Sequence, residues 1–532
     1  MSRDYDGIIL GSGHNSLILQ AYLGLAGLRV LCLERRDVPG GGLATFEDER
    51  FPGFRHNIHS FFHRAIRQAP WYADLELERR GAHYLEPELN VALVSKSGTS
   101  LEWWTDFERT AASFEQWSTK DAATLRRWRD AFLPVVERIL IPEAQSPPLP
   151  PERRQALLEK SALGRLLLET SALSPLAFVE REFEHPLIKA GLLFFNGLRE
   201  VDLRCPGFGH HIAMLLASEG KAQMIRGGSA ALADALLRAV ESSGGTVRLG
   251  SSPAGSWWSA VGVETASGEV LRARLFVASG LNPHQTFLDL LDERDLPGAW
   301  RQKAADFRYN LIAPLFGLNL CLSEPPRYRA AEKLPHLDRA FMVILGLEDF
   351  AQYPEIVRHH EAGTLSPTVM WGASPTLFDP SQAPAGRHTA FMWEELPYRL
   401  GGDARNWDAA REPHGAEMLK VWTEYAPNLD DAVLGWFARS PLDTERTLSN
   451  MREGDLLVGA FTNGQVGFHR PFPGAGHYRG PIAGLYLCGS SSHPGGNVTG
   501  LPGYNSAPVV LADLGLPAPW APGPLEARLS RL

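Results

Sequence analysis

The chain has 532 residues and a mass of 58.6 kDa, which exceeds what one compact core usually holds, so we expect at least two domains. Asp and Glu (61) outnumber Lys and Arg (52), the net charge is −9 and no basic run is present, which argues against nucleic acid as a partner. The four cysteines are scattered without a CxxC pair, which argues against disulfides and a metal site. Because no secretion signal precedes the first strand and no uncharged apolar stretch reaches the ~20 residues of a membrane span, we expect a cytoplasmic protein.

The first predicted elements are a strand, a glycine turn and a helix. Residues 7–10 form a short apolar strand, and a helical pattern follows the turn over residues 17–27. In such a turn the first glycine allows the tight bend, the second lets the backbone approach a pyrophosphate, and a small third residue permits close packing of helix on strand. The third position holds Ser, which should loosen this packing. The candidate ligand-binding residues of the turn are Gly11, Ser12, Gly13, Asn15 and Ser16.

The second predicted strand ends in an acidic residue, and its spacing from the glycine turn is informative. Glu34 follows Gly13 by about 20 residues, the spacing of a carboxylate that binds a ribose hydroxyl. A glycine loop alone is more often an ordinary turn, but together with this acid it favours a dinucleotide site. Arg35, the glycine run 40–42 (Gly40, Gly41 and Gly42) and Thr45 come next, where a nicotinamide-binding fold would continue into a plain crossover. This loop favours FAD.

The far end of the chain carries a second glycine-rich segment after a strand. Residues 484–488 are apolar, and glycines recur between residues 489 and 503 before an apolar helix. A helix that begins near residue 500 would direct its N–H groups at an oxygen of the flavin pyrimidine ring. The candidate residues of this segment are Gly489, Val498, Thr499, Gly500 and Leu501.

These motifs resemble the phytoene desaturase (carotenoid desaturase)-like family of FAD-dependent oxidoreductases, and most closely its pyridine nucleotide-disulphide oxidoreductase domain-containing branch. The pattern includes His-Pro-Gly-Gly at 493–496, Gly-x-x-Gly-Tyr-Asn at 500–505 and the glycine pair at 227–228. The resemblance implies an α/β fold with a discontinuous Rossmann-like FAD-binding domain and a mixed α+β substrate domain. We place the FAD-binding domain at 1–65, 215–290 and 445–532, and the substrate domain at 66–214 and 291–444. Residues 250–260 break the strand expected near the adenine, so no residue is assigned there.

A histidine-rich segment after the ribityl loop supplies the catalytic candidate. In the resembled proteins this part of the chain passes from the cofactor to the substrate, and His59 is the first choice here. A histidine can exchange a proton near neutral pH, as a reaction that removes a hydride and a neighbouring proton requires. A structural histidine bonded to backbone is the alternative for His59. His493 is a second candidate, although its Pro-Gly-Gly neighbours suggest a turn.

The resemblance implies a dehydrogenase or desaturase that acts on a carbon–carbon bond of an apolar terpenoid, carotenoid-like or alicyclic substrate. Only one dinucleotide fingerprint is present, so we expect oxygen, a quinone or another carrier to accept the electrons. The sequence leaves four alternatives open: a flavin-dependent isomerase, a saturase, an amine oxidase, and a non-catalytic flavin-bound assembly protein. It also leaves a homodimer open.

An apolar stretch bears on how such a substrate arrives. Residues 163–178 read as one helix whose leucines share a face, and this face either packs inside the substrate domain or lies on a membrane. Because the chain is acidic and has no polybasic segment, docking to anionic lipid is disfavoured. We expect at most weak, salt-insensitive peripheral contact with a membrane.

Overall fold

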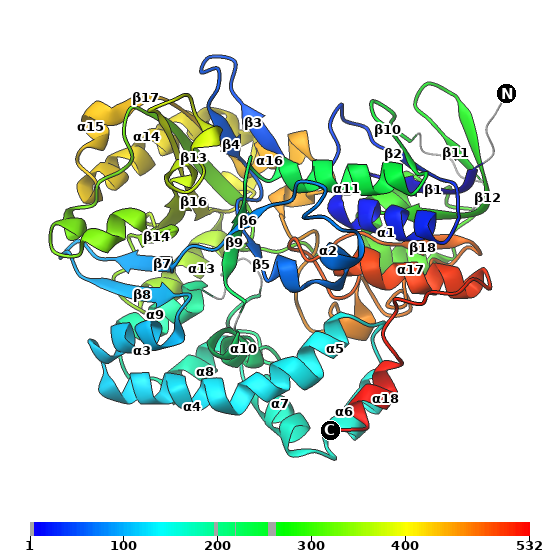
Figure 1. Cartoon of the computed structure of the whole chain (residues 1–532), viewed down its shortest axis with the longest axis horizontal. Helices are drawn as coiled ribbons and strands as arrows, with labels where there is room; N and C mark the ends of the chain where they lie inside the picture. The colour runs from blue at the N-terminus through cyan, green and yellow to red at the C-terminus, as the bar shows by residue number, and fades with distance from the viewer. Residues whose placement is uncertain (1–4, 196–200, 219, 254–261) are drawn as a thin grey trace.

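The N-terminal strand lies at the centre of a mostly parallel sheet (Figure 1). The computed structural model describes residues 5–195, 201–218, 220–253 and 262–532. The strands of this sheet come from three separated parts of the chain: β10 (Thr246–Arg248), β2 (Val30–Leu33), β1 (Tyr5–Leu10), β12 (Val270–Ser279), β18 (Leu485–Leu487), which pairs with β12, and the antiparallel β11 (Gly262–Glu264). The sheet confirms the predicted α/β class with a discontinuous Rossmann-like domain.

Three helices cover one face of this sheet. They are α1 (His14–Leu25), α11 (Ala230–Ser242) and α17 (Leu501–Asp513), and their buried side chains form one apolar core with the strands. The short helix α2 (Pro70–Asp74) adds Trp71 and Tyr72 to the same core, beyond the predicted domain boundary at residue 65. The position of the boundary stays a prediction. The irregular segment predicted at 250–260 falls largely on residues 254–261, which lie outside the described residues.

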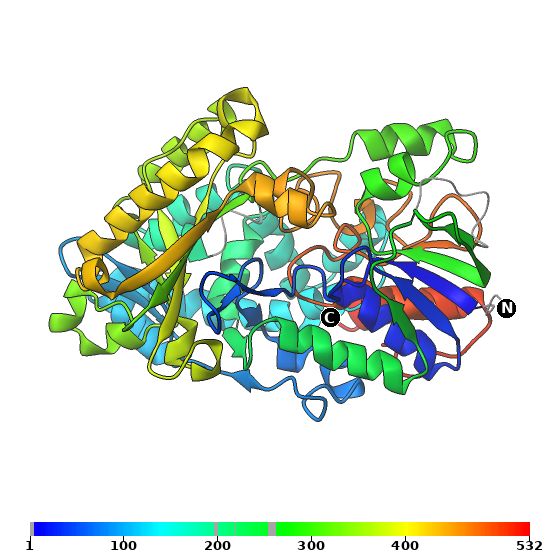
Figure 2. The same ribbon diagram turned by 90° about the horizontal axis from the view of Figure 1, so that it is seen from above.

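A second sheet of seven strands builds the other half of the molecule. In spatial order its strands are β17 (Val433–Arg439), β13 (Leu315–Leu322), β16 (His388–Glu395), β15 (Met370–Ala373), β14 (Met342–Leu345), β7 (Leu89–Val94) and β8 (Ser100–Trp104). All neighbouring pairs are antiparallel except β14 with β7. Figure 2 shows the two sheets side by side, with the long helix α14 (Trp407–Tyr425, yellow) against the second. This mixed sheet confirms the predicted α+β substrate domain.

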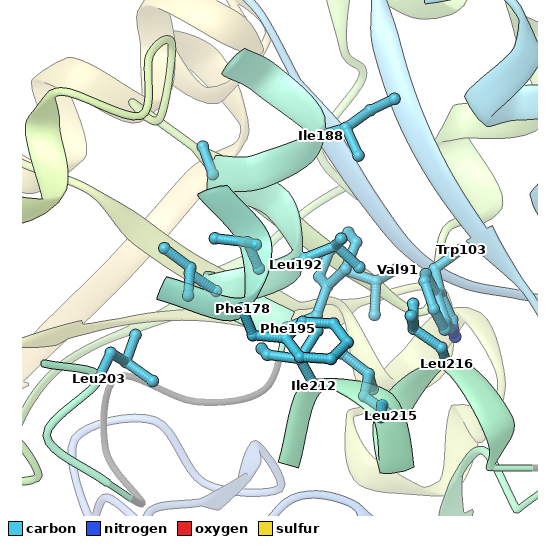
Figure 3. Close-up of a cluster of buried hydrophobic side chains, with 14 of the residues drawn as sticks. Val91, Trp103, Phe178, Ile188, Leu192, Phe195, Leu203, Ile212, Leu215 and Leu216 are labelled. Carbon is cyan, nitrogen blue, oxygen red and sulfur yellow. The ribbon is translucent and has the colours of Figure 1, made fainter. Parts of the chain in front are cut away.

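A layer of helices begins on the opposite face of the second sheet and continues below the first sheet (Figure 1). These helices are α3 (Phe107–Glu115), α4 (Thr119–Val135), α5 (Ile141–Ala144), α6 (Pro151–Leu158), α7 (Ala162–Ala172), α8 (Pro175–Glu182), α9 (Pro186–Phe195) and α10 (His210–Ala217). Between α4 and α5 the chain makes a π-helical turn, Val136–Leu140. Figure 3 shows the apolar cluster under this layer, in which Val91 and Trp103 of the sheet meet Phe195, Ile212 and Leu215 of the helices.

The apolar stretch at 163–178 is two helices rather than the single helix predicted. Ser174 caps the N-terminus of α8 through a bond from the Ala177 N–H, and Pro175 at the first helical position cannot continue α7, so the axes bend by 105°. Among the described residues, no single helix is long and apolar enough to cross a membrane; only this bent pair together passes such a test. Leu167 and Phe178 are fully buried in the helical layer, while the neighbouring leucines are partly buried against it.

Two small sheets join the halves next to the glycine turn. One pairs β3 (Thr45–Glu47) with β4 (Arg55–Asn57), and the other pairs β9 (Ala222–Ile225) with β5 (His63–Arg64) and β6 (Tyr84–Leu85). The loop between β4 and β5 contains the predicted catalytic histidine. These connections bring residues 58–62 to the junction of both sheets and the helical layer.

Candidate active site

A cavity of about 730 Å³ lies where the three layers meet. From the first sheet come the two glycine-rich segments, and from the second sheet comes Trp393. The helical layer contributes apolar side chains of α4, the π-helical turn, α5 and α10: Leu133, Val136, Ile141, Met214 and Leu215. The cavity therefore joins a backbone-rich surface to an apolar one, which is the arrangement of a site that holds a cofactor next to an apolar substrate.

The glycine turn and the following glycine run are held together by their backbones. The Gly40 N–H donates to the Ser12 carbonyl (2.8 Å), and a Cβ at Gly41 would lie 3.2 Å from the Cα of Gly13. Gly13 has an ordinary extended backbone (φ −62°, ψ 161°), and a Cβ built on it meets no heavy atom within 4 Å. The space in front of Gly13 belongs to the cavity, so a side chain there would fill room that a ligand can occupy.

Glu34 fixes the glycine turn. Its Oε2 accepts hydrogen bonds from the Ser12 N–H (2.9 Å) and hydroxyl (2.8 Å), and its Oε1 accepts from the Arg36 N–H (2.9 Å). Oε2 already accepts two bonds, whereas Oε1 accepts one and can accept a second, so the residue remains available to a ribose hydroxyl through Oε1. Glu34 does not itself line the cavity.

Replacing Glu34 by Ala should therefore destabilise the domain as well as weaken cofactor binding. Hydrogen bonds to a charged acceptor contribute about 1.5–3 kcal/mol each, and two buried N–H groups would lose their partner, so we expect the free energy of unfolding to fall by at least about 2 kcal/mol. Chemical denaturation measures this change, and flavin content measures the second effect. Glu49→Ala, which removes an exposed glutamate, is the control. Equal stability of both variants would contradict this role of Glu34.

Ser16 packs closely, although the sequence predicted a looser contact at this position. Its hydroxyl lies where a Cβ on Gly280 would stand, and it also contacts the Cys488 thiol (3.8 Å). Because Gly280, at the end of β12, has no side chain, helix α1 approaches the sheet without the usual third glycine. The glycine that allows this close packing is Gly280 of the facing segment rather than a third glycine in the turn.

The C-terminal segment meets the glycine turn from the other side. Helix α17 begins at Leu501 with Gly500 as its N-cap, which confirms the predicted helix start. Gly500 has φ +68°, and a Cβ there would collide with Trp71 and Ile18. The Trp71 indole N–H donates to the Thr499 carbonyl (2.8 Å), which fixes the backbone just before the helix.

The structure brings only part of the predicted residue set to the cavity. The lining residues are Gly13, Asn15, Ser16, Gly41, Gly42, His59, Gly489, Val498 and Thr499. The others lie behind it: Gly11, Ser12, Glu34, Arg35, Gly40, Thr45, Gly500 and Leu501. Binding of a cofactor by any of these residues stays a prediction.

Arg35 and Thr45 serve other contacts. Arg35 is exposed and reaches the Thr447 carbonyl (3.4 Å), whereas the neighbouring Arg36 turns inward and donates to the Gly41 carbonyl (3.1 Å). Thr45 accepts from the Ala230 N–H (3.1 Å) at the start of α11. Arg36 was missed because the sequence does not show which of two adjacent arginines faces inward.

Several buried polar atoms on the cavity wall have no hydrogen-bond partner among the described residues. They are His14 Nε2, Asn15 Oδ1 and His59 Nε2. A buried polar atom without a partner costs about 1–3 kcal/mol, so such a group indicates a ligand or ordered water. Together with the open space at Gly13 and the helix start at α17, these atoms fit a dinucleotide of the FAD type. Sequence analysis missed His14 because it occupies a variable position of the fingerprint.

His59 lines the cavity. Burial, helped by the positive charges of Arg439 and Arg36, holds its pKa well below the ordinary value of 6.5, so the ring is neutral at pH 7. Its catalytic role stays a prediction. His493 does not line the cavity: its Nε2 donates to the Glu143 carbonyl (3.0 Å), as suits the turn role considered for it.

Buried histidines should make the protein sensitive to mild acid. Burial lowers the pKa of His14, His56 and His493 to about 4 and that of His63 to about 3. Between pH 6.5 and 4 the unfolded chain binds more protons than the folded one, so stability is fully present above pH 6.5 and falls with pH by up to about 1.4 kcal/mol per unit for each histidine. We expect the Tm of the holoprotein to drop steadily from pH 6.5 to 5. A flat Tm over this interval, measured by calorimetry, would contradict the burial of these rings.

Comparison with known proteins identifies the domain type and the family of the chain. A model of the NAD(P)-binding Rossmann-like domain matches residues 9–75, which contain the glycine turn and Glu34. A limonene dehydrogenase component of Castellaniella defragrans is 30% identical over 541 residues, covering 97% of this chain and 96% of that protein. Pyridine nucleotide-disulfide oxidoreductase domain-containing protein 2 of Rattus norvegicus is 29% identical over 561 residues, covering 97% and 94%.

More distant relatives place the chain in a wider group. Phytoene desaturase (lycopene-forming) of Pantoea ananas is 24% identical over 542 residues, covering 95% of this chain and 99% of that protein. The structure of putrescine oxidase bound to putrescine superposes with a TM-score of 0.62 at 15% identity, covering 97% of this chain and all of that one, which shows a shared fold. The chain belongs to the phytoene desaturase-like family of FAD-dependent oxidoreductases, as its motifs predicted.

Proposed function

We propose that this protein is an FAD-dependent dehydrogenase that removes a hydride and a proton across a carbon–carbon bond of an apolar, terpenoid or alicyclic substrate. The observation that carries the proposal is the cavity, which runs from the glycine turn to an apolar wall made by α4, α5 and α10. When bound, FAD would supply the hydride acceptor. The names of two relatives, a limonene dehydrogenase component and a phytoene desaturase, support the reaction class.

The chain itself would bind and orient the two reactants. The backbone at Gly13 offers room for close approach of the cofactor, and Met214, Leu215 and Trp393 offer apolar contact to a hydrocarbon ring. Burial of an apolar side chain of this size stabilises by about 1.5–3 kcal/mol, so a few such contacts hold a small hydrocarbon and exclude water. Because the nearby histidines are neutral, the wall adds no fixed positive charge from imidazole.

An amine oxidase is the second candidate, favoured by the shared fold with putrescine oxidase. The cavity supports it less. Among the described residues that line the cavity, Glu137 is the one carboxylate, and its side chain is exposed rather than placed beside the glycine segments. A cationic amine would be better stabilised by a nearby acidic group.

Anaerobic mixing of the holoprotein with a panel of compounds tests the proposal. The panel contains cyclic terpene hydrocarbons, their saturated counterparts and primary amines, and the bleaching of flavin absorption reports reduction. We expect bleaching by at least one alicyclic hydrocarbon and by none of the amines. Bleaching by amines alone would favour the oxidase, and product formation without net flavin reduction would favour the isomerase. A flavin that no compound reduces would favour an assembly role.

A further inference from the structure

Three side chains beside the proposed active site form a chain of hydrogen bonds. Ser60 and His63 both line the cavity, and the Ser60 hydroxyl lies 3.0 Å from His63 Nε2. The other ring nitrogen, Nδ1, lies 2.6 Å from the hydroxyl of Tyr84 on β6. The antiparallel pairing of β5 and β6 with β9 holds this geometry. The chain therefore leads from Ser60 at the cavity to Tyr84 behind it.

The charge state of His63 limits how the hydrogens can be arranged. Burial and the neighbouring His14 lower the pKa of His63 to about 3, so the ring is neutral at pH 7 and one of its nitrogens donates while the other accepts. Two arrangements are then possible. Either Ser60 donates to Nε2 and Nδ1–H donates to Tyr84, or Tyr84 donates to Nδ1 and Nε2–H donates to Ser60.

Tyr84 decides between them. Burial raises the pKa of its hydroxyl, which therefore stays protonated, and within the described part of the chain its one polar contact is His63. In the first arrangement this O–H would have no acceptor, at a cost of about 1–3 kcal/mol. In the second arrangement the Tyr84 O–H donates to Nδ1 and Nε2–H donates to the Ser60 oxygen. The hydroxyl hydrogen of Ser60 is then the one that His63 does not accept. The second arrangement is favoured, and it leaves the Ser60 hydroxyl free to donate into the cavity.

An independent observation shows that the same part of the wall is prepared for a polar ligand atom. His59, next to Ser60 in the loop, is 8% exposed, and its Nε2 has no partner among the described residues although it lines the cavity. Ser60 is also 8% exposed, and its backbone is held by a hydrogen bond from the Ser229 hydroxyl to the Ser60 carbonyl. The loop thus presents two buried polar groups to the cavity.

We infer that Ser60 donates a hydrogen bond to a carbonyl oxygen or imine-type nitrogen of a ligand in this cavity, with His63 and Tyr84 as positioning residues. This inference rests on the proposed function for the identity of the site. Two ligands carry the required acceptor: the ring system of the flavin, and a substrate that bears an oxygen on its alicyclic skeleton. In the second case the preferred substrate is a cyclic terpenoid ketone or similar compound rather than a plain hydrocarbon.

The test compares three variants of the holoprotein, with the flavin oxidised for the spectrum and reduced for ligand binding, so that no substrate is oxidised. Ser60→Ala removes the donor, Tyr84→Phe removes the hydroxyl that orients it, and Tyr72→Phe is the matched control. The ring of Tyr72 lies 5.9 Å from that of Tyr84, but its hydroxyl donates to the Ala82 carbonyl and takes no part in the chain. The two measurements are the absorption spectrum of the bound flavin and the Kd of a monocyclic terpenoid ketone beside that of its parent hydrocarbon.

If the flavin is the acceptor, Ser60→Ala shifts the flavin absorption maximum. If the substrate is the acceptor, the flavin spectrum stays constant. Ser60→Ala then raises the Kd of the ketone about three- to tenfold and leaves the Kd of the hydrocarbon unchanged. Tyr84→Phe should cause a smaller change in the same direction, and Tyr72→Phe none. A Ser60→Ala variant that alters neither measurement overturns the inference, as does a Tyr72→Phe variant that matches Tyr84→Phe. Because these measurements need no substrate oxidation, they stand apart from the test of the reaction itself.

Discussion

Gly13→Val should purify as a folded protein without flavin. The backbone of Gly13 is in a conformation that valine adopts readily, and no heavy atom lies within 4 Å of the added Cβ, so the fold should tolerate the change. The new side chain would enter the cavity where the pyrophosphate is expected. If a pyrophosphate thereby loses two hydrogen bonds to backbone N–H groups of the turn, each worth about 1.5–3 kcal/mol, the affinity for the cofactor falls at least about a hundredfold.

Flavin content per polypeptide, measured after gel filtration, checks this result. Gly523→Val is the matched control. A Cβ added at Gly523 also meets no heavy atom within 4 Å, its φ is not positive, and the residue does not line the cavity. We expect the control to keep its flavin and both variants to melt cooperatively. Stoichiometric flavin in a folded Gly13→Val protein would place the pyrophosphate elsewhere.

Met214→Asp should strongly impair the oxidation of apolar substrates while the flavin content stays normal. Met214 lies on α10 in the apolar wall of the cavity, and the short aspartate side chain cannot reach out to water as a lysine would. The variant loses an apolar contact of about 1.5–3 kcal/mol and places an unpaired charge beside the substrate. We therefore expect kcat/KM to fall at least about a hundredfold.

The rate of anaerobic flavin reduction as a function of substrate concentration measures this loss. Met214→Leu, which nearly conserves volume, should change kcat/KM by less than about tenfold. If Met214→Asp kept the parental rate, the substrate would not lie against α10, and the proposed position of the substrate would be wrong.

The sequence was sufficient for the parts of the fold that local chemistry determines. The glycine turn and the helix start at Gly500 each need a backbone conformation or a close approach that few residues allow, and Glu34 follows from its spacing to the turn. The structure places the turn and the helix start where they were predicted. The spacing between strand, turn and acid then limits the fold to a Rossmann-like sheet. For this reason the cofactor half of the cavity could be proposed before any contact was known.

Other features depend on contacts between distant segments. Ser16 packs tightly only because Gly280 faces it, more than two hundred residues further along the chain. The order of Ser60, His63 and Tyr84 is visible only once β5 and β6 pair with β9. The stretch at 163–178 had the periodicity of one helix, and its break at Ser174 depended on a cap whose strength the apolar pattern does not reveal.

A single turnover of the holoprotein with an alicyclic substrate tests the central claim most directly. Flavin absorption is followed under anaerobic conditions while the product is identified by mass spectrometry. The account predicts one product molecule, lighter by two hydrogens, for each flavin reduced. Reduction of the flavin without such a product, or its reduction by amines and by no alicyclic compound, would contradict the account.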